Sequence, residues 1–386
     1  MFEFLKRGPE IRLGNEKYIC PYCFERFDKY AFQCSNNRCK GKATGASNDK
    51  VFAAPNKDSA VCPDCKQNTF KKVCPKCYQE LPESTLDHED CIISIVGSRA
   101  SGKSHFVGVL IHEMINRIAP GMSHGAFEGF ADSYTRYMTN FADKIYQGQA
   151  LPLSQRAEVN DAVAKPYIFK YRFQDPKKKK VRCYTFVFFD TAGEDLRDDD
   201  NMSTVNKYIC ESSGIIFLLD PMNIQGVVNS LDKDWVMRAS GGVSEYEGAA
   251  YEIIIRVSKL IRNNKKLKAN QKIDIPVAAV FSKYDAFESL VPDGSRVKQA
   301  SPHVKVGKFV EEDRVAVNRE IETLLQDKGA TAFTSLLENN YSTYSYFAVS
   351  SLGLDNNPSS NRFDIPHPHR IEDPLLWLMK IGGKLV

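Results

Sequence analysis

The chain has 386 residues, enough for two or three domains of about 100–200 residues each. Its 52 Lys and Arg against 48 Asp and Glu give a net charge of +4, which is too small to indicate a nucleic-acid-binding protein by itself. No apolar run reaches the ~18 residues of a membrane span, and the first residues lack the apolar core of a signal peptide, so we expect a cytoplasmic protein.

Eight of the eleven cysteines form four pairs near the amino terminus, after a tail over residues 1–15 that shows no periodicity. Knuckles with the C-x2-C spacing bring thiolates together in the tetrahedral sets that Zn²⁺ prefers, and disulfides are rare in the cytosol. We therefore predict a double zinc ribbon over residues 16–82 that holds two Zn²⁺. The predicted ligands are Cys20, Cys23, Cys34, Cys39, Cys62, Cys65, Cys74 and Cys77.

The simplest pairing of these ligands is sequential, with the first four cysteines around one ion and the last four around the other. Interleaved pairing stays open, because sequence does not fix connectivity. Residues 1–82 hold six more Lys and Arg than Asp and Glu, but two ions with four thiolates each contribute about −4. This balance favours a protein-docking or structural role over a nucleic-acid reader, and residues 83–90 then form a linker.

The apolar run Ile92–Val96 has the length of a strand and leads into GSRASGKS over residues 97–104, which fits the phosphate-loop pattern G-x-x-x-x-G-K-[ST]. An apolar-faced helical pattern follows and is expected to end near Pro120. Backbone N–H groups would surround a polyphosphate, Lys103 would add a positive charge, and Ser104 would bind Mg²⁺. The predicted nucleotide contacts are Gly97, Ser98, Arg99, Ala100, Ser101, Gly102, Lys103, Ser104 and His105.

Residues 122–165 show helix and loop patterns and no strand signal. The next two β-type runs, Tyr167–Gln174 and Val181–Asp190, are joined by a connection too short for a crossover, so we expect an antiparallel hairpin. The second run delivers Asp190 at its carboxyl end, where it is placed to hold Mg²⁺ through water, and the Gly193 N–H is placed to contact the γ-phosphate.

The DTAG sequence at residues 190–193 resembles switch II of the TRAFAC class, the Ras-like and translation-factor-related GTPases. Further strands are expected at Gly214–Asp220 and Pro276–Phe281. The second ends in SKYD over residues 282–285, similar to the guanine motif [NT]-K-x-D of that class. The resemblance implies that Asp285 pairs with guanine and that the Lys283 stem lies along the base, while Ser282 replaces the usual Asn or Thr.

A last strand at Tyr346–Val349 is followed by a segment similar to the loop that offers an N–H to the guanine O6 in this class. Its residues are Ser350, Ser351 and Leu352, with Ser351 at the matching position. Asp373-Pro374 predicts the start of a final helix.

The resemblance implies an α/β, Ras-like P-loop G domain over residues 91–386, with a mostly parallel sheet, one antiparallel hairpin strand and helices on both faces. It implies GTP or GDP with Mg²⁺ as ligands. Insertions are expected near residues 120–165, 222–270 and 286–345. The zinc knuckles and the carboxyl-terminal EDPLLWLM also resemble bacterial double-GTPase-type proteins of multi-component signalling or defence systems, which implies protein partners. The sequence does not indicate an oligomeric state.

Glu194 occupies the position at which Ras-like proteins carry the water-positioning Gln. An ionised Glu cannot donate to the γ-phosphate oxygens and adds like charge, so we expect slow hydrolysis. Arg99 could act as an arginine finger in cis, block an arginine that arrives from a partner, or simply face solvent. Arg136 and Arg156 are further candidate fingers. For the switch I ligand of Mg²⁺ we predict Ser154, with Thr139 as the second choice.

Three other functions stay open at this stage. Glu194 also fits a GTP-binding scaffold that does not hydrolyse its nucleotide, and Ser282 leaves an ATPase open. A nucleic-acid-linked NTPase that uses the zinc ribbons would require salt-dependent binding to RNA or DNA.

Overall fold

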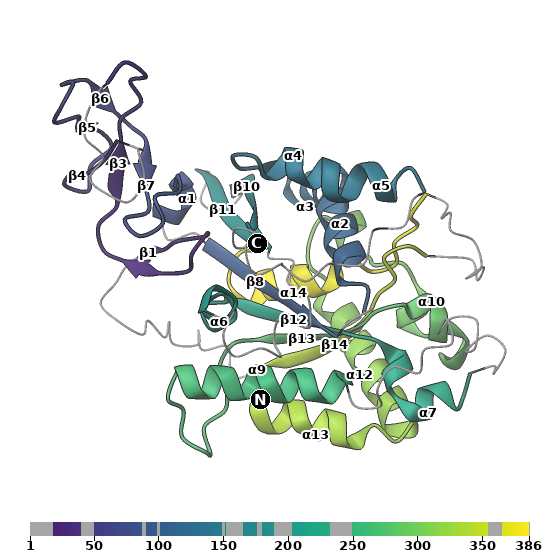
Figure 1. Cartoon of the computed structure of the whole chain (residues 1–386). Helices are drawn as coiled ribbons and strands as arrows, with labels where there is room; N and C mark the ends of the chain where they lie inside the picture. Colours follow the sequence, from purple (N-terminus) through teal and green to yellow (C-terminus); the bar gives the residue numbers. More distant parts are fainter. Residues whose placement is uncertain are drawn as a thin grey trace. The chain divides into compact units, whose positions relative to one another are not determined.

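The computed structural model describes residues 18–39, 50–86, 90–98, 101–148, 151, 165–175, 180–188, 203–231, 249–353 and 365–385. The chain divides into two compact units, Met1–His88 and Glu89–Val386 (Figure 1). The division lies within the segment predicted as a linker. No helix in these ranges is long and apolar enough to cross a membrane.

The first unit is built from short strands and buries several aromatic side chains as well as a small aliphatic cluster. Strands β1 and β2 pair as one antiparallel hairpin, β5 and β6 as another, and β4, β3 and β7 form a three-stranded sheet. Ala31, Val51 and Val73 make the buried cluster, against which Tyr78 packs. The elements are β1 (Tyr18–Ile19), β2 (Arg26–Phe27), β3 (Ala31–Gln33), β4 (Val51–Ala53), β5 (Ala60–Val61), β6 (Asn68–Thr69), β7 (Lys72–Val73) and α1 (Glu83–Leu86).

The second unit contains a seven-stranded sheet with the order β14-β13-β12-β8-β11-β10-β9. Strands β14 to β11 in this order run parallel, whereas β10 pairs antiparallel with both β11 and β9. The predicted mixed, mostly parallel sheet with one antiparallel hairpin is therefore confirmed. The strands are β8 (Asp90–Gly97), β9 (Ala126–Gly129), β10 (Tyr167–Asp175), β11 (Lys180–Phe188), β12 (Gly214–Leu219), β13 (Val277–Phe281) and β14 (Tyr344–Ala348).

Helices cover both faces of this sheet, with α2, α4 and α14 on one side and α6, α9 and α13 on the other (Figure 1). The helical elements, in which η1 and η2 are π-helical turns and the other η elements are 3-10 turns, have the following bounds: α2 (Lys103–Glu113), η1 (Met114–Ile118), α3 (Ala119–Ser123), α4 (Ser133–Tyr137), η2 (Met138–Ala142), α5 (Asp143–Ile145), α6 (Ser203–Cys210), η3 (Pro221–Asn223), α7 (Gln225–Val228), α9 (Ala249–Asn264), α10 (Tyr284–Phe287), η4 (Glu288–Leu290), η5 (Arg296–Lys298), α11 (His303–Val306), α12 (Glu311–Asp327), α13 (Thr331–Asn340) and α14 (Asp373–Ile381).

Two local predictions in this unit are wrong. The segment predicted to lack strands contains β9, a four-residue edge strand in which only Phe127 is buried, so its alternation is too short to read from sequence. The helix that follows the phosphate loop continues past Pro120 to Ser123. Pro120 stands in the first turn of α3, where a missing N–H is tolerated, and His124 ends the helix in the left-handed region.

Central strand β8 is buried on both faces, as its apolar run predicts. Ile93 and Ile95 pack in one cluster with Phe106 of α2 and Leu375 of α14. On the other face, the Ser94 hydroxyl contacts the Tyr208 carbonyl oxygen of α6 at 3.4 Å. The strand that precedes the phosphate loop is thus fixed from both sides.

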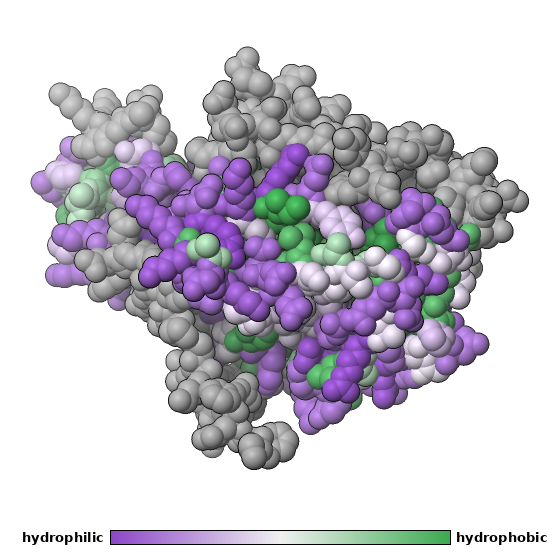
Figure 2. Space-filling model, turned by 90° about the horizontal axis from the view of Figure 1, so that it is seen from below, coloured by the Kyte–Doolittle hydropathy of each residue, from purple (hydrophilic) through white to green (hydrophobic). Residues whose placement is uncertain are grey.

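Helix α9 shows how the outer layer meets solvent. Ile254, Val257 and Ile261 are buried at helical spacing, while Glu252 and Arg256 form an exposed ion pair of 3.0 Å. Figure 2 shows the molecule from the side of α9 and α13, where hydrophilic residues cover most of the described surface and hydrophobic residues form small separate groups.

Removing side-chain volume from β8 should destabilise the second unit strongly. We expect Ile95→Ala to lower the free energy of unfolding by about 2–5 kcal/mol, because it leaves a cavity in a fully buried cluster. Val181→Ala is the matched control in the same sheet, since Val181 is 65% exposed and its truncation should cost less than about 0.5 kcal/mol. Denaturant titration measures both, and equal losses would contradict the assigned core.

Candidate functional site

The predicted phosphate and base motifs follow strands that end at the same edge of the sheet. In the strand register Gly97 lies opposite Leu218, and Leu219 lies opposite Phe281, which lies opposite Ala348. The carboxyl ends of four neighbouring parallel strands therefore end at one level. In open α/β sheets this edge is where ligands bind.

The phosphate loop is shaped by two glycines. A Cβ atom at Gly97 would lie 2.5 Å from the Ser101 Oγ and 2.7 Å from the Leu218 carbonyl oxygen, so no larger residue fits between the loop and β12. Gly102 has a φ of +81° and starts helix α2. The Phe106 N–H then donates to the Gly102 carbonyl oxygen at 2.8 Å, and the helix N-terminus faces the loop.

This loop fits an anion with several oxygens. The hydroxyls of Ser98 and Ser101 are buried and have no hydrogen-bond partner among the described residues. The Lys103 side chain is buried beside them at the start of α2, where the helix dipole is positive. Buried polar groups of this kind are normally satisfied, and phosphate oxygens would satisfy them.

His105 joins the phosphate loop to the base motif electrostatically. Burial lowers the pKa of His105, and the nearby Lys283 ammonium lowers it further. His105 therefore stays neutral at pH 7, and the first turn of α2 lies close to Lys283.

The base motif and the loop after β14 meet at a hydrogen bond. The Ser350 hydroxyl donates to Asp285, and the Gly353 N–H donates to the Ser350 oxygen at 2.9 Å. Burial raises the pKa of Asp285, while the Ser350 hydrogen bond acts in the opposite direction. The result is an oriented, half-buried carboxylate that can accept hydrogen bonds from a planar ligand with N–H donors.

Ser282 makes hydrogen bonds of its own where the family pattern has Asn or Thr. Its hydroxyl and its backbone N–H both donate to the Leu219 carbonyl oxygen, at 3.1 Å and 2.9 Å. The substitution therefore ties the end of β13 to the end of β12.

Asp220 is a site residue that the sequence reasoning did not identify. Its carboxylate lies 2.5 Å from the Lys283 Nζ and also accepts the Met222 N–H at 2.9 Å. Lys283 itself has a φ of +54°, so its backbone and its ammonium group are both constrained. The sequence does contain a signal for Asp220: it is an Asp at the end of a buried strand, and that strand lies beside the strand that leads into the base motif.

Several predicted residues lie outside the described residues, namely Arg99, Ala100, Ser154, Arg156, Asp190, Gly193 and Glu194. Arg136 is held by the fold, because its guanidinium donates to the Lys165 and Pro166 carbonyl oxygens at 2.8 Å and 2.6 Å and lies over the Tyr167 ring. The Thr139 hydroxyl donates within its own helix to the Thr135 carbonyl oxygen. These contacts favour neither a finger role for Arg136 nor a metal-ligand role for Thr139.

The eight amino-terminal cysteines gather into two groups of four whose sulfurs all lie within 4.8 Å of one another. The shortest S···S distances in them run from 3.6 to 3.9 Å. A tetrahedral zinc ion with Zn–S bonds of about 2.3 Å would place its sulfurs about 3.8 Å apart, so both groups are compatible with Zn²⁺. The groups are Cys20, Cys23, Cys74, Cys77 and Cys34, Cys39, Cys62, Cys65.

The sequential pairing, which is the simplest one from sequence, is therefore wrong, and the ligand sets are nested: the first pair joins the last, and the two middle pairs join each other. Three of the pairs share one knuckle geometry, in which the residue after the second cysteine has a positive φ and donates its N–H to the carbonyl oxygen of the first. Those residues are Phe24, Lys66 and Tyr78. Strand β3 pairs with both β4 and β7, which brings the first knuckle to the last.

Comparison with known proteins gives distant matches. No model of a protein family matches the chain. A curated protein of Mycolicibacterium smegmatis, described as "Putative ESX-1 scaffolding and assembly protein SaeC", is 21% identical over 336 residues, 81% of this chain and 80% of that protein.

Among solved structures, the chain is similar to Roco2 RocCORdC of Methanosarcina barkeri bound to GDP, with 13% identity, a TM-score of 0.28 and 77% of this chain covered. The GTPase-like domain of Ski7 from S. cerevisiae bound to GTP matches with 10% identity, a TM-score of 0.34 and the same coverage. The chain spans about half of each of these two solved chains, 51% in both cases. Such TM-scores do not establish a shared fold, so the fold rests on the strand order and motif positions given above.

The nested ligand sets predict which pairs of cysteines share an ion. We expect two zinc ions per wild-type chain and one in the double variant Cys20→Ser/Cys74→Ser, because both changes fall in one set. Sequential sets would leave none. Cys20→Ser/Cys62→Ser is the control that damages both sets under either pairing, and native mass spectrometry counts the ions.

Proposed function

We propose that the chain is a GTP-binding and slowly GTP-hydrolysing molecular switch of the TRAFAC class, with a G domain over residues 91–386. The observation that carries this proposal is the Ser350–Asp285 hydrogen bond at the sheet edge that also bears the phosphate loop. Fixed donors and acceptors for a base thus lie beside a loop suited to phosphates.

In this proposal Asp285 accepts hydrogen bonds from the guanine N1–H and 2-amino groups, which adenine does not offer. The Lys283 stem, oriented by Asp220, lies along the base, and the Ser351 N–H meets the guanine O6. The phosphate loop with Lys103 holds the phosphates. Ser104 would bind Mg²⁺ directly, with Asp190 acting through water and Ser154 as the switch I ligand.

Hydrolysis is proposed to be slow in the isolated protein. Glu194 stands where a water-positioning amide would act, and its negative charge adds to that of the γ-phosphate. Arg136 is bound to backbone carbonyl oxygens, so Arg99 of the phosphate loop and Arg156 remain the candidates for charge stabilisation in cis. A partner protein could supply an arginine instead.

We propose that two zinc-bound ribbons and the insertions carry the nucleotide state to a protein partner. The similar mycolicibacterial protein is named for scaffolding and assembly, which supports a role in a multi-component system. The same name, together with Glu194, favours one alternative, a GTP-holding scaffold that does not turn over. We expect the protein to act in the cytoplasm.

Nucleotide binding and turnover of the full-length chain test this proposal. We expect GTP and GDP, but not ATP, to bind in the presence of Mg²⁺, with a turnover rate well below ~1 s⁻¹ that rises when partner proteins are added. Glu194→Ala should change the rate without loss of binding. Preference for ATP would overturn the proposal, while tight GTP binding without any turnover, alone or with partners, would leave the scaffold.

At Asp285, nucleotide binding and folding stability are expected to respond to pH in opposite directions. Burial raises the pKa of its carboxyl, so the ionised form costs folding free energy at neutral pH. This cost starts to shrink as the pH falls through the raised folded-state pKa, and it is gone below the lower pKa of the unfolded chain. Guanine recognition needs the ionised form, so GTP affinity should fall as the pH is lowered through that raised pKa.

Asp285→Asn provides the matched test of this trade-off. We expect a Tm at pH 7 that is equal to or higher than that of the wild type, together with loss of GTP binding. Thermal melts and fluorescence titrations from pH 5 to 8 measure both effects. An Asp285→Asn protein that binds GTP normally would count against the assigned base motif.

A further inference from the structure

The loop after β14 is clasped by a second segment of the chain. The Ser350 N–H donates to the His369 carbonyl oxygen at 3.1 Å, and the His369 N–H donates back to the Ser350 carbonyl oxygen at 2.9 Å. The His367 N–H donates to the Leu352 carbonyl oxygen at 2.9 Å. Gly353 has a φ of +62°, and a Cβ there would lie 2.1 Å from the His367 carbonyl oxygen. The two segments thus fit closely, and we name this pairing of residues 350–353 with 367–369 the clasp.

His369 extends the clasp to the base motif. Its ring stacks on Tyr284, with centroids 4.7 Å apart and an angle of 17°. Its Nε2 donates to the Val297 carbonyl oxygen at 2.7 Å, and this fixes the tautomer because a carbonyl oxygen only accepts. Tyr284 lies between Lys283 and Asp285 in the chain, so the clasp packs on the segment that carries the proposed base site.

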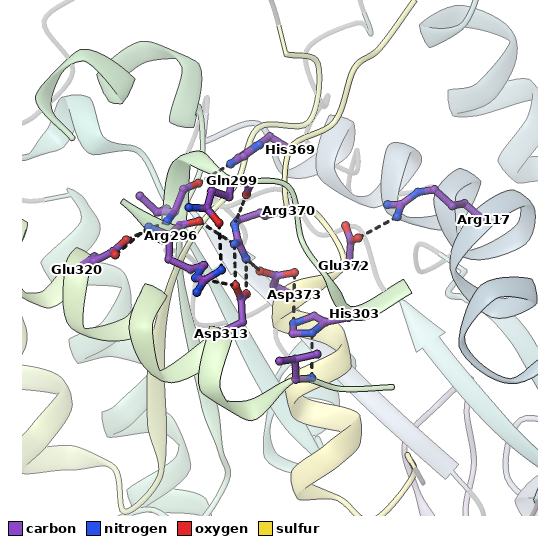
Figure 3. A network of polar contacts seen from close by, with 12 residues as sticks. Arg117, Arg296, Gln299, His303, Asp313, Glu320, His369, Arg370, Glu372 and Asp373 are labelled. Carbon is purple, nitrogen blue, oxygen red and sulfur yellow. Dashed lines mark hydrogen bonds and ion pairs between the residues drawn. The ribbon is translucent and has the colours of Figure 1, made fainter. Parts of the chain in front are cut away.

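Arg370 follows the clasp and is locked in place (Figure 3). Its side chain is buried and uses all five of its N–H donors: three bonds of 2.6 to 3.2 Å reach Asp313 and Asp373, and two of 2.8 Å reach the carbonyl oxygens of Arg296 and Gln299. Its φ of +50° lies in the left-handed region, which residues other than glycine seldom adopt. These contacts hold a backbone turn that would otherwise relax.

The charges around Arg370 leave no place for a metal ion. His303, Asp313 and Asp373 have the spacing of a ligand set, but Arg370 already bridges the two carboxylates. The His303 Nδ1 accepts the Val310 N–H at 3.1 Å, so Nε2 carries the proton and faces Asp373 at 3.6 Å. Burial lowers the pKa of His303 to about 4, so the ring is neutral at pH 7.

The rest of the network joins three further elements. Arg117 of η1 donates to Glu372 at 2.9 Å, and the Arg296 guanidinium lies 3.6 Å from Asp313. Glu320 of α12 accepts the backbone N–H groups of Arg296 and Val297 at 2.8 Å and 2.9 Å, so the carbonyl oxygens that hold Arg370 and His369 are themselves anchored (Figure 3). The network therefore fixes the position of the segment that carries the clasp.

We propose that Arg370 is a positioning residue for guanine specificity. By locking the segment over residues 367–370, it holds Ser350 against Asp285 and sets the backbone of the loop that would meet the guanine O6. Arg370 does not touch the nucleotide in this arrangement. The inference rests on the proposed GTP-binding function and adds to it a specificity determinant remote from the SKYD motif.

The test compares GDP and ADP affinities of the zinc-loaded, full-length chain by competition against a fluorescent GDP. Arg370→Lys keeps the charge between Asp313 and Asp373 but cannot donate to all five acceptors. We expect its GDP affinity, measured on folded protein, to fall about tenfold while its ADP affinity stays unchanged. Gly353→Ala should produce the same selective loss, because it opens the clasp without disturbing the buried charges.

Arg117→Gln is the matched control, since it removes an arginine from the other end of the network. It should lower the Tm and leave the ratio of GDP to ADP affinity unchanged. A Gly353→Ala protein that keeps the wild-type ratio overturns the inference, even if Arg370→Lys does not fold. Arg370→Lys that lowers only the Tm overturns it as well. A wild-type chain without preference for GDP overturns the proposed function itself.

Discussion

The common level at which β8, β12, β13 and β14 end is the constraint on which the candidate site depends. Parallel strands in one register deliver the residues that follow them to one edge, whatever their separation in sequence. Gly97 maintains this arrangement, because its backbone passes too close to β12 for any side chain. A slip of one residue in β13 would reverse which of Ser282 and Lys283 faces the site.

The proposed base site contains partly buried charged groups, and contacts around and behind the site stabilise them. Asp285 is ionised at a cost in folding free energy, and Ser350 offsets part of that cost by donating to it. In a similar way, the Asp220 carboxylate forms an ion pair with the Lys283 ammonium group. Behind them, the Arg370 network has every guanidinium donor satisfied, which is the condition under which a buried ion pair specifies one geometry. In the proposed function, stability and recognition thus oppose each other at Asp285 and support each other at Arg370.

The first unit illustrates a different balance. Its buried side chains include Ala31, Val51 and Val73 and aromatic rings such as Phe32 and Phe52, but a unit this small gains limited stability from hydrophobic burial alone. The nested cysteine sets link the first knuckle to the last and enclose the second set between them. Metal binding in such an arrangement would constrain a long loop of the unfolded chain, whereas sequential sets would only close two short loops.

Sequence alone predicted the central strands and the antiparallel hairpin, and it singled out the phosphate-loop and base motifs and the eight paired cysteines. These features depend on local periodicity or on short motifs whose residues are adjacent in the chain. It missed β9, a four-residue edge strand with a single buried side chain, and it ended the helix after the phosphate loop three residues early. Tertiary structure decided the pairing of the cysteines, the Asp220–Lys283 contact and the Arg370–Asp313 contact. These contacts join residues 23 to 63 positions apart, and no local pattern encodes which distant partner a side chain will meet.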